Sequence, residues 1–137
     1  QVSDWEQKAE MLLSRFEMSD KTDKLGKELS KGMQQKLSIC CALLPEPKVV
    51  LFDEPFVGLD PHAIKELKAV MTELRYDECA VLISTHMLDS VEEFWDKALI
   101  MRNGQIAAVR ERKEIEQSGE DLEKLFFEIT EGRGENQ

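Results

Sequence analysis

Four consecutive apolar residues, Val49 to Phe52, are followed directly by two carboxylates, Asp53 and Glu54. A short continuous apolar run of this kind predicts a strand buried on both faces, as in a parallel sheet. Parallel α/β sheets place their ligand sites at the carboxyl ends of their strands. Two adjacent acids there repel one another, so a cation such as Mg²⁺, which binds carboxylates together with phosphate oxygens, would offset the cost. Alternatively, the two acids simply begin a solvated loop.

Hydrophobic periodicity around this strand predicts alternating helices and strands. Apolar residues recur at helical spacing over residues 5–16, 33–44, 64–74, 87–95 and 122–129. A second buried strand is predicted over 79–83, and Asn103-Gly104 predicts a hairpin that joins 97–101 to 105–109. Strands that alternate with helices imply an α/β fold with a parallel sheet.

Capping signals mark the starts of three of these helices. Ser3 with Glu6 forms a capping-box pattern, Ser30 stands at an N-cap position, and Asp60-Pro61 reads as N-cap and first helical residue. The helix after Ser30 is expected to bury one face and to stop at two prolines. That face is predicted to contain Met33, Leu37, Cys40, Cys41 and Leu44, and the prolines are Pro45 and Pro47. The tail after Glu131 is polar and is expected to fray.

The chain has 137 residues, the size of one domain with its own core, and a net charge of −10 at pH 7. A surface this acidic argues against nucleic acid or anionic lipid as the main partner. No apolar run approaches the ~20 residues of a membrane span, and no signal-peptide pattern opens the chain. Three cysteines do not make a disulfide framework and are expected to be small buried side chains. Because the chain does not begin with Met, we expect it to be a fragment.

Three further motifs surround the strand of Asp53 and Glu54. Leu29-Ser30-Lys31-Gly32-Met33 lies upstream, Gly58-Leu59-Asp60-Pro61 follows downstream, and Ser84-Thr85-His86 comes after the next strand. In this order the motifs resemble the signature motif, the Walker B strand, the D-loop and the switch histidine of an ABC transporter ATP-binding subunit. The Lys31-Gly32-Met33 form is similar to bacterial exporter-type subunits.

The resemblance implies ATP and Mg²⁺ as cofactors and assigns a role to each acidic or basic site residue. Asp53 would hold Mg²⁺ through water, and Glu54 would be the general base that polarises the attacking water. His86 would contact the γ-phosphate region, although a histidine of this kind is alternatively a core residue. Asp60 would bridge to the partner subunit, and it is also an N-cap candidate.

The resemblance further implies that Ser30, Lys31, Gly32 and Met33 act in trans, because family subunits pack head to tail. Ser30 and the helix N-terminus would face the γ-phosphate that the other subunit holds, and Gly32 would allow close approach of the backbone. Lys31 and Met33 depart from the common family signature, which has Gly and Gln at these positions. Lys31 adds positive charge near the phosphate, whereas Met33 offers no hydrogen bond.

No G-x-x-x-x-G-K-S/T phosphate loop occurs in the chain, whose sole Gly-Lys pair, Gly26-Lys27, is followed by Glu28. The expected fold is therefore a partial P-loop NTPase (RecA-like) parallel sheet with part of the ABC helical subdomain. We expect a helical portion with the signature motif over residues 1–46, the C-terminal half of the ATPase core over 47–110, and a C-terminal helix and tail over 111–137. The missing N-terminal half of the domain would be a companion, and the chain alone would be an inactive ATPase.

The resemblance implies a subunit that couples ATP binding and hydrolysis to transport. Its partners would be a transmembrane subunit and a second ATP-binding subunit, and it would lie peripherally at the cytoplasmic face of the cell membrane. One alternative is a soluble ABC-type ATPase of DNA repair or of the ribosome. The other is a non-enzymatic interaction module that retains the fold. A serine hydrolase built on Ser84 and His86 is rejected, because the chain has no G-x-S-x-G elbow.

Overall fold

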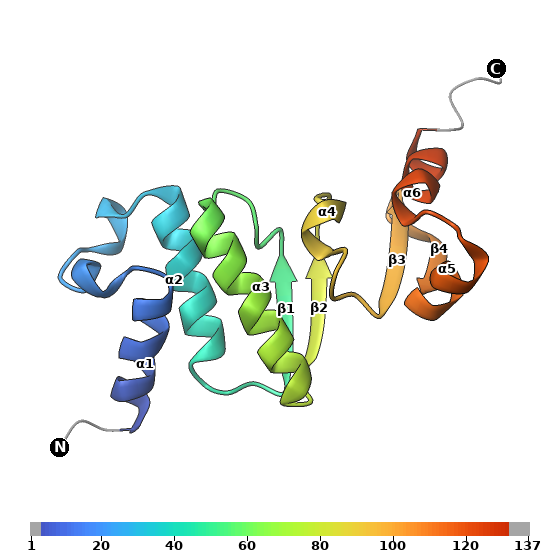
Figure 1. The fold of residues 1–137 in the computed structure, drawn as a ribbon. Coiled ribbons are helices and arrows are strands. Elements are labelled where there is room, and N and C mark those ends of the chain that lie inside the picture. Colours follow the sequence, from blue (N-terminus) through green and yellow to red (C-terminus); the bar gives the residue numbers. More distant parts are fainter. Residues whose placement is uncertain (1–3, 132–137) are drawn as a thin grey trace. The chain divides into compact units, whose positions relative to one another are not determined.

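The computed structural model describes residues 4–131, which form two compact units, and the boundary between them in the sequence falls between Met87 and Leu88 (Figure 1). The first unit contains three helices, two short 3₁₀ turns and two strands. They are α1 (Asp4–Arg15), η1 (Ser19–Lys21), η2 (Gly26–Glu28), α2 (Lys31–Leu43), β1 (Val49–Asp53), α3 (Pro61–Tyr76) and β2 (Ala80–Ser84). The expected Ser3 cap and the tail after Glu131 lie outside the described residues.

The parallel pairing predicted for the first unit is confirmed. β1 and β2 run parallel, from Val49 opposite Ala80 to Asp53 opposite Ser84, with α3 as the connection between them. In Figure 1 the three helices follow one another beside the strand pair, and α3 lies nearest to it. The core of this unit contains side chains from every long helix, from β1, and from the segments that directly follow α1 and β1. They are Leu12, Phe16, Ile39, Leu43, Leu67, Val70, Val50, Phe52 and Phe56.

The expectation that β1 is buried on both faces is wrong for the described residues. Its side chains alternate, with Val50 and Phe52 buried, whereas Val49 is 62% exposed and Leu51 72% exposed. Leu82, opposite Leu51 in the parallel register, is 54% exposed. The helices of this unit cover one face of the strand pair. We call the other face, with Val49, Leu51 and Leu82, the open sheet face.

The buried face of α2 is rotated from the predicted one. It contains Lys36, Ile39, Cys40 and Leu43, whereas Cys41, which was expected to be buried, is exposed. The sequence pattern favoured the wrong face because it counted only apolar residues, and Lys36 occupies one position of the true buried face. Burial raises the pKa of the Cys40 thiol to about 11, with the neighbouring Cys41 as a smaller cause, so Cys40 is a protonated, inert side chain.

The second unit is a hairpin with short helices. It contains α4 (Leu88–Val91), β3 (Lys97–Arg102), β4 (Gln105–Glu111), α5 (Arg112–Ser118) and α6 (Leu122–Thr130). The predicted hairpin is confirmed, since Asn103 and Gly104 take φ values of 52° and 74°, both positive as a type I′ turn requires. α4 is shorter than the helix predicted over 87–95, and α5 was not predicted.

Each strand of the described chain has a single pairing partner. β2 pairs only with β1, and β3 pairs only with β4, within residues 4–131. One edge of each strand therefore presents backbone groups without a ladder partner. The expected division of the chain into segments 1–46, 47–110 and 111–137 stays a prediction.

Candidate functional site

The carboxyl ends of β1 and β2 bring two of the predicted motifs together. Asp53 lies opposite Ser84 in the register, and the Ser84 hydroxyl donates a hydrogen bond to Asp53 Oδ1. The backbone N–H of Glu54 donates to the carbonyl of Ser84 at 2.8 Å, which continues the strand pairing by one residue. The side chains that follow the two strands are thereby fixed at the same edge of the sheet.

Both carboxylate oxygens of Glu54 are held by the segment after β2. Oε2 accepts a hydrogen bond from the Thr85 hydroxyl at 3.2 Å. Oε1 accepts one from the His86 backbone N–H at 3.2 Å and lies 2.7 Å from His86 Nδ1. The Thr85 hydroxyl oxygen in turn accepts from the Met87 N–H at 3.0 Å. The segment after β2 therefore fixes the orientation of the Glu54 carboxylate.

His86 is a surface residue in the described chain. Its side chain is 70% exposed and that of Glu54 is 37% exposed, so the alternative of a core histidine is wrong. Since the imidazole contacts Glu54 and otherwise faces solvent, it is available to a ligand at this edge of the sheet. The structure thus brings Asp53, Glu54 and His86 into one site.

Glu54 has a backbone conformation that L-amino acids rarely adopt. Its φ is 45°, in the left-handed region, which costs a non-glycine residue roughly 1–2 kcal/mol. The next residues, Pro55 and Phe56, are almost fully buried and fix where the chain goes after this turn. The turn directs the Glu54 side chain toward β2.

The signature-like motif forms the start of α2. Ser30 is the N-cap, as predicted, and its hydroxyl oxygen accepts from the Met33 N–H at 3.2 Å. A Cβ atom on Gly32 would lie 2.6 Å from the carbonyl oxygen of Gly58. Glycine at position 32 is therefore required by the chain's own packing, a reason that the sequence did not reveal.

Two polar contacts, also missed from the sequence, attach α2 to the loop of residues 55–60. Lys36 Nζ lies 2.6 Å from Asp60 Oδ2, with the lysine side chain 10% exposed and the aspartate 47% exposed. Gln35 Nε2 donates to the Pro55 carbonyl at 3.2 Å. The sequence offered no signal for the ion pair, because a lysine in a helix normally lies on a solvated face; once buried, its ammonium needs an anionic partner.

Asp60 serves two elements at once. Its Oδ1 accepts from the Ala63 N–H at 3.0 Å and caps α3, as predicted, while Oδ2 pairs with Lys36. The Lys36 ammonium, and then the Ala63 N–H, lower the pKa of the Asp60 carboxyl to about 2. Together with the Gly32–Gly58 contact, this links the start of α2 to the 55–60 loop.

Lys31 and Met33 take no part in these contacts. Lys31 is exposed and Met33 is half-buried, and the Met33 side chain makes no hydrogen bond. Within residues 4–131 no group of three or more His, Cys, Asp or Glu side chains is arranged to hold a metal ion. No helix in this part of the chain is long and apolar enough to cross a membrane.

The family model described as ABC transporter matches residues 3–57. The chain is 40% identical to the ABC-type transporter ATP-binding protein EcsA of Bacillus subtilis, over 87% of this chain and 50% of EcsA. It is 32% identical to the lipopolysaccharide export system ATP-binding protein LptB of Haemophilus influenzae, over 88% of this chain and 50% of LptB.

A solved structure, described as an ATP binding subunit of an ABC transporter, superposes with a TM-score of 0.84 at 34% identity. The superposition covers 93% of this chain and 56% of that subunit. The chain thus spans about half the length of the curated relatives it matches. Its α/β fold is the corresponding part of an ABC cassette, and the chain belongs to the ABC transporter ATP-binding protein family.

Proposed function

We propose that the protein couples the binding and hydrolysis of Mg-ATP to a transmembrane transport step, and that this chain supplies the hydrolytic carboxylate. The observation that carries the proposal is the Glu54 carboxylate, held from two sides by Thr85 and His86 beyond the ends of two parallel strands. The transport role is taken from the relatives, since EcsA is named as an ABC-type transporter ATP-binding protein and LptB as the ATP-binding protein of a lipopolysaccharide export system.

Glu54 is the general base in this proposal. A carboxylate oxygen has two lone pairs, so Oε2 can accept the Thr85 hydroxyl and still accept a proton from water. Phosphoryl transfer requires mainly positioning and charge neutralisation, so a single aimed carboxylate suffices as base. The contacts from Thr85 and His86 fix the orientation of the carboxylate before any nucleotide binds, which lowers the entropy cost of the reactive geometry.

Asp53 would hold Mg²⁺, and the donors around it fit this ion. The Asp53 carboxylate and the Ser84 hydroxyl offer oxygen ligands at an exposed strand end. Mg²⁺ commonly takes one or two protein carboxylates and completes its octahedron with water and phosphate oxygens. A site with few protein donors is therefore what this ion needs beside a nucleotide. The ion, when bound, neutralises charge on the phosphates.

His86 would sense the γ-phosphate from its place beside Glu54. Its ring is exposed, and its Nδ1 is engaged with the Glu54 carboxylate, which leaves the opposite ring nitrogen directed away from that oxygen. A histidine held in this way can donate to a phosphate oxygen at the same sheet edge. Its movement would then be transmitted to the base.

Ser30, Lys31, Gly32 and Met33 would serve the site of a second, head-to-tail subunit. The start of α2 offers backbone N–H groups and positive dipole potential to an anion, and Lys31 adds a charge there. Asp60 would reach the partner subunit from the 55–60 loop. We further propose that the phosphate loop lies in the rest of the protein, and that the protein docks on a transmembrane subunit at the cytoplasmic face of the membrane.

The test replaces Glu54 by Gln in the full-length protein. Glu54→Gln keeps the shape and removes the base, so steady-state ATP turnover should fall at least ~100-fold while the Kd for Mg-ATP changes less than threefold. Glu78→Gln is the matched control. Glu78 also has a left-handed backbone, with φ 56°, but it is exposed and precedes β2, at the end of that strand opposite to the site. Near wild-type turnover in Glu54→Gln would show that another group is the base.

A further inference from the structure

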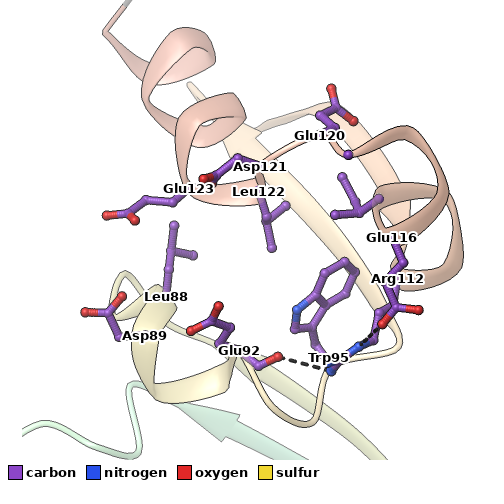
Figure 2. Close-up of a pocket in the computed structure, with 12 residues that line it drawn as sticks. Leu88, Asp89, Glu92, Trp95, Arg112, Glu116, Glu120, Asp121, Leu122 and Glu123 are labelled. Atoms are coloured by element: carbon purple, nitrogen blue, oxygen red, sulfur yellow. Dashed lines mark hydrogen bonds and ion pairs between the residues drawn. The ribbon is translucent and has the colours of Figure 1, made fainter.

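A groove of about 410 Å³ lies within the second unit, bounded by α4 and the turn after it, by α5, and by the first turn of α6 (Figure 2). None of its lining residues belongs to the candidate nucleotide site, whose residues all precede Leu88. Four half-buried apolar side chains line it, one or two from each element. They are Leu88, Trp95, Ile115 and Leu122. We call this feature the acidic groove, because carboxylates surround it.

Arg112 holds the walls of the acidic groove together. Its Nη1 donates to the Glu92 carbonyl at 3.1 Å and its Nε to Glu116 at 2.9 Å. Its guanidinium lies 5.9 Å from the ring centroid of Trp95, and its backbone N–H donates to the Asp96 carbonyl at 2.8 Å. The contacts with Glu92, Trp95 and Asp96 therefore fix the turn after α4 against the start of α5, whereas the contact with Glu116 lies within α5. The groove is built by the fold rather than left by loose packing.

The carboxylates at the acidic groove fall into two groups. In the first group, each carboxylate has a partner: Glu116 is paired with Arg112, Glu120 is paired with Arg110 at 2.9 Å, and Asp121 accepts from the Lys124 N–H as the N-cap of α6. By contrast, Asp89, Glu92 and Glu123 are exposed, and none has an ion-pair partner within residues 4–131. In Figure 2, Asp89 and Glu92 project from the α4 side and Glu123 from the α6 side of the opening, with Leu88 between them. Like charges gathered in this way repel unless a cation binds.

Charge decides which occupants fit. A second copy of the chain carries a net charge of −10, and nucleic acids and anionic lipids are also negative, so all three are repelled by the rim. A lone metal ion would leave the apolar lining unused, and no metal-binding group of three side chains exists in the described part of the chain. The remaining class of occupant is a protein segment that has both an apolar stripe and flanking positive charges.

We propose that the acidic groove docks a short basic amphipathic helix of a partner protein. Apolar side chains at positions i, i+3 or i+4, and i+7 of such a helix would contact Leu88, Trp95 and Leu122. Lys or Arg side chains beside that stripe would reach Asp89, Glu92 and Glu123, since long basic side chains carry apolar stems along a surface. The proposal does not depend on ATP chemistry at Glu54.

The test uses the fluorescence of Trp95 in the full 137-residue chain. Trp5, the other tryptophan, is 61% exposed and is replaced by Phe, so that all tryptophan fluorescence comes from Trp95. The probe is a synthetic peptide of about 12 residues, three helical turns, cross-linked to stay helical, with Leu on one face and Lys beside it. It should give a saturable shift of the Trp95 emission, whereas the same composition with Leu scattered around the helix should not.

Neutralising the rim should weaken this binding. The triple variant Asp89→Asn, Glu92→Gln, Glu123→Gln should raise the Kd about tenfold, the combined effect of three exposed ion pairs. Its matched control changes the net charge equally at exposed carboxylates that do not line the groove, namely Glu10→Gln, Glu78→Gln and Glu128→Gln, and should leave the Kd within about twofold. The proposal is overturned by an absence of saturable binding, by equal binding of the scattered peptide, or by equal weakening in the control variant.

Discussion

The Lys36–Asp60 ion pair predicts an asymmetry between two substitutions that break it. Asp60→Asn keeps the cap of α3, since Asn caps a helix as well as Asp does, but it leaves the Lys36 ammonium in a site that is 10% exposed. Lys36→Met replaces the ammonium by an apolar chain of similar length and leaves Asp60, 47% exposed, in contact with water. Asp60→Asn should therefore lose more folding stability than Lys36→Met, because it retains the more buried of the two charges.

The magnitudes follow from burial. An unpaired, largely buried charged group costs ~1–3 kcal/mol, so Asp60→Asn should lower the free energy of unfolding by about 2 kcal/mol. The pKa of Asp60 falls from 3.8 to about 2, which would correspond to ~2 kcal/mol, but solvent screening of a half-exposed carboxyl reduces this to ~1 kcal/mol or less. Lys36→Met should accordingly cost under ~1 kcal/mol.

Urea unfolding followed by far-UV circular dichroism, at one fixed protein concentration, measures both variants. Asp60→Asn should lower the midpoint by about 1 M, and Lys36→Met by half of that or less. In the Lys36→Met background, Asp60→Asn should be nearly neutral, because no buried ammonium remains. Equal effects of the two single variants, or a full cost of Asp60→Asn in that background, would refute the reasoning.

The sign of the pH dependence follows from the lowered pKa of Asp60. Because the folded chain binds a proton to this carboxyl less readily than the unfolded chain does, the ion pair's contribution is complete above the ordinary pKa of 3.8. It is lost as the pH falls through about 2. Lys36→Met should remove the part of this acid sensitivity that the ammonium causes, and leave the part that the Ala63 N–H causes.

Three further predictions concern the chain as a whole. Gly32→Ala should destabilise it by ~1–3 kcal/mol in urea unfolding, because the new Cβ would meet the Gly58 carbonyl at 2.6 Å, whereas Gly26→Ala, with open space around it, should be tolerated. The 137-residue chain should bind Mg-ATP at best weakly by isothermal titration, and micromolar affinity would contradict the proposed need for a separate phosphate loop. Light scattering should show concentration-dependent self-association of the pure chain through the open sheet face, reduced by Leu51→Thr; a compact monomer at all concentrations would disprove this.

Local signals made much of the fold predictable. Ser30 and Asp60 were identified as N-caps because an oxygen-bearing side chain directly precedes an amphipathic run. Asn103-Gly104 identified the hairpin because both residues tolerate positive φ. The site at the ends of β1 and β2 followed from the rule that parallel strands place functional side chains at one edge.

Features that depend on distant contacts were not predictable in the same way. α5 has one apolar residue on its inner side, Ile115, so hydrophobic periodicity did not reveal it, although the Glu111–Glu114 capping box and the left-handed Gly119 bound it. The Lys36–Asp60 pair joins residues in different elements. A lysine in a helix normally indicates a solvated face, and only the packed structure shows that this one is covered.

The left-handed turn at Glu54 sets stability against activity at a single position. Glycine is the residue best suited to a φ of 45°, so Glu54→Gly would relieve backbone strain and yet remove the carboxylate that Thr85 and His86 hold. Selection for thermal stability alone would favour losing the acid. The retention of a glutamate in so unfavourable a conformation therefore means that the chain lies away from its stability optimum at this point, and a search for stabilising variants should leave position 54 unchanged.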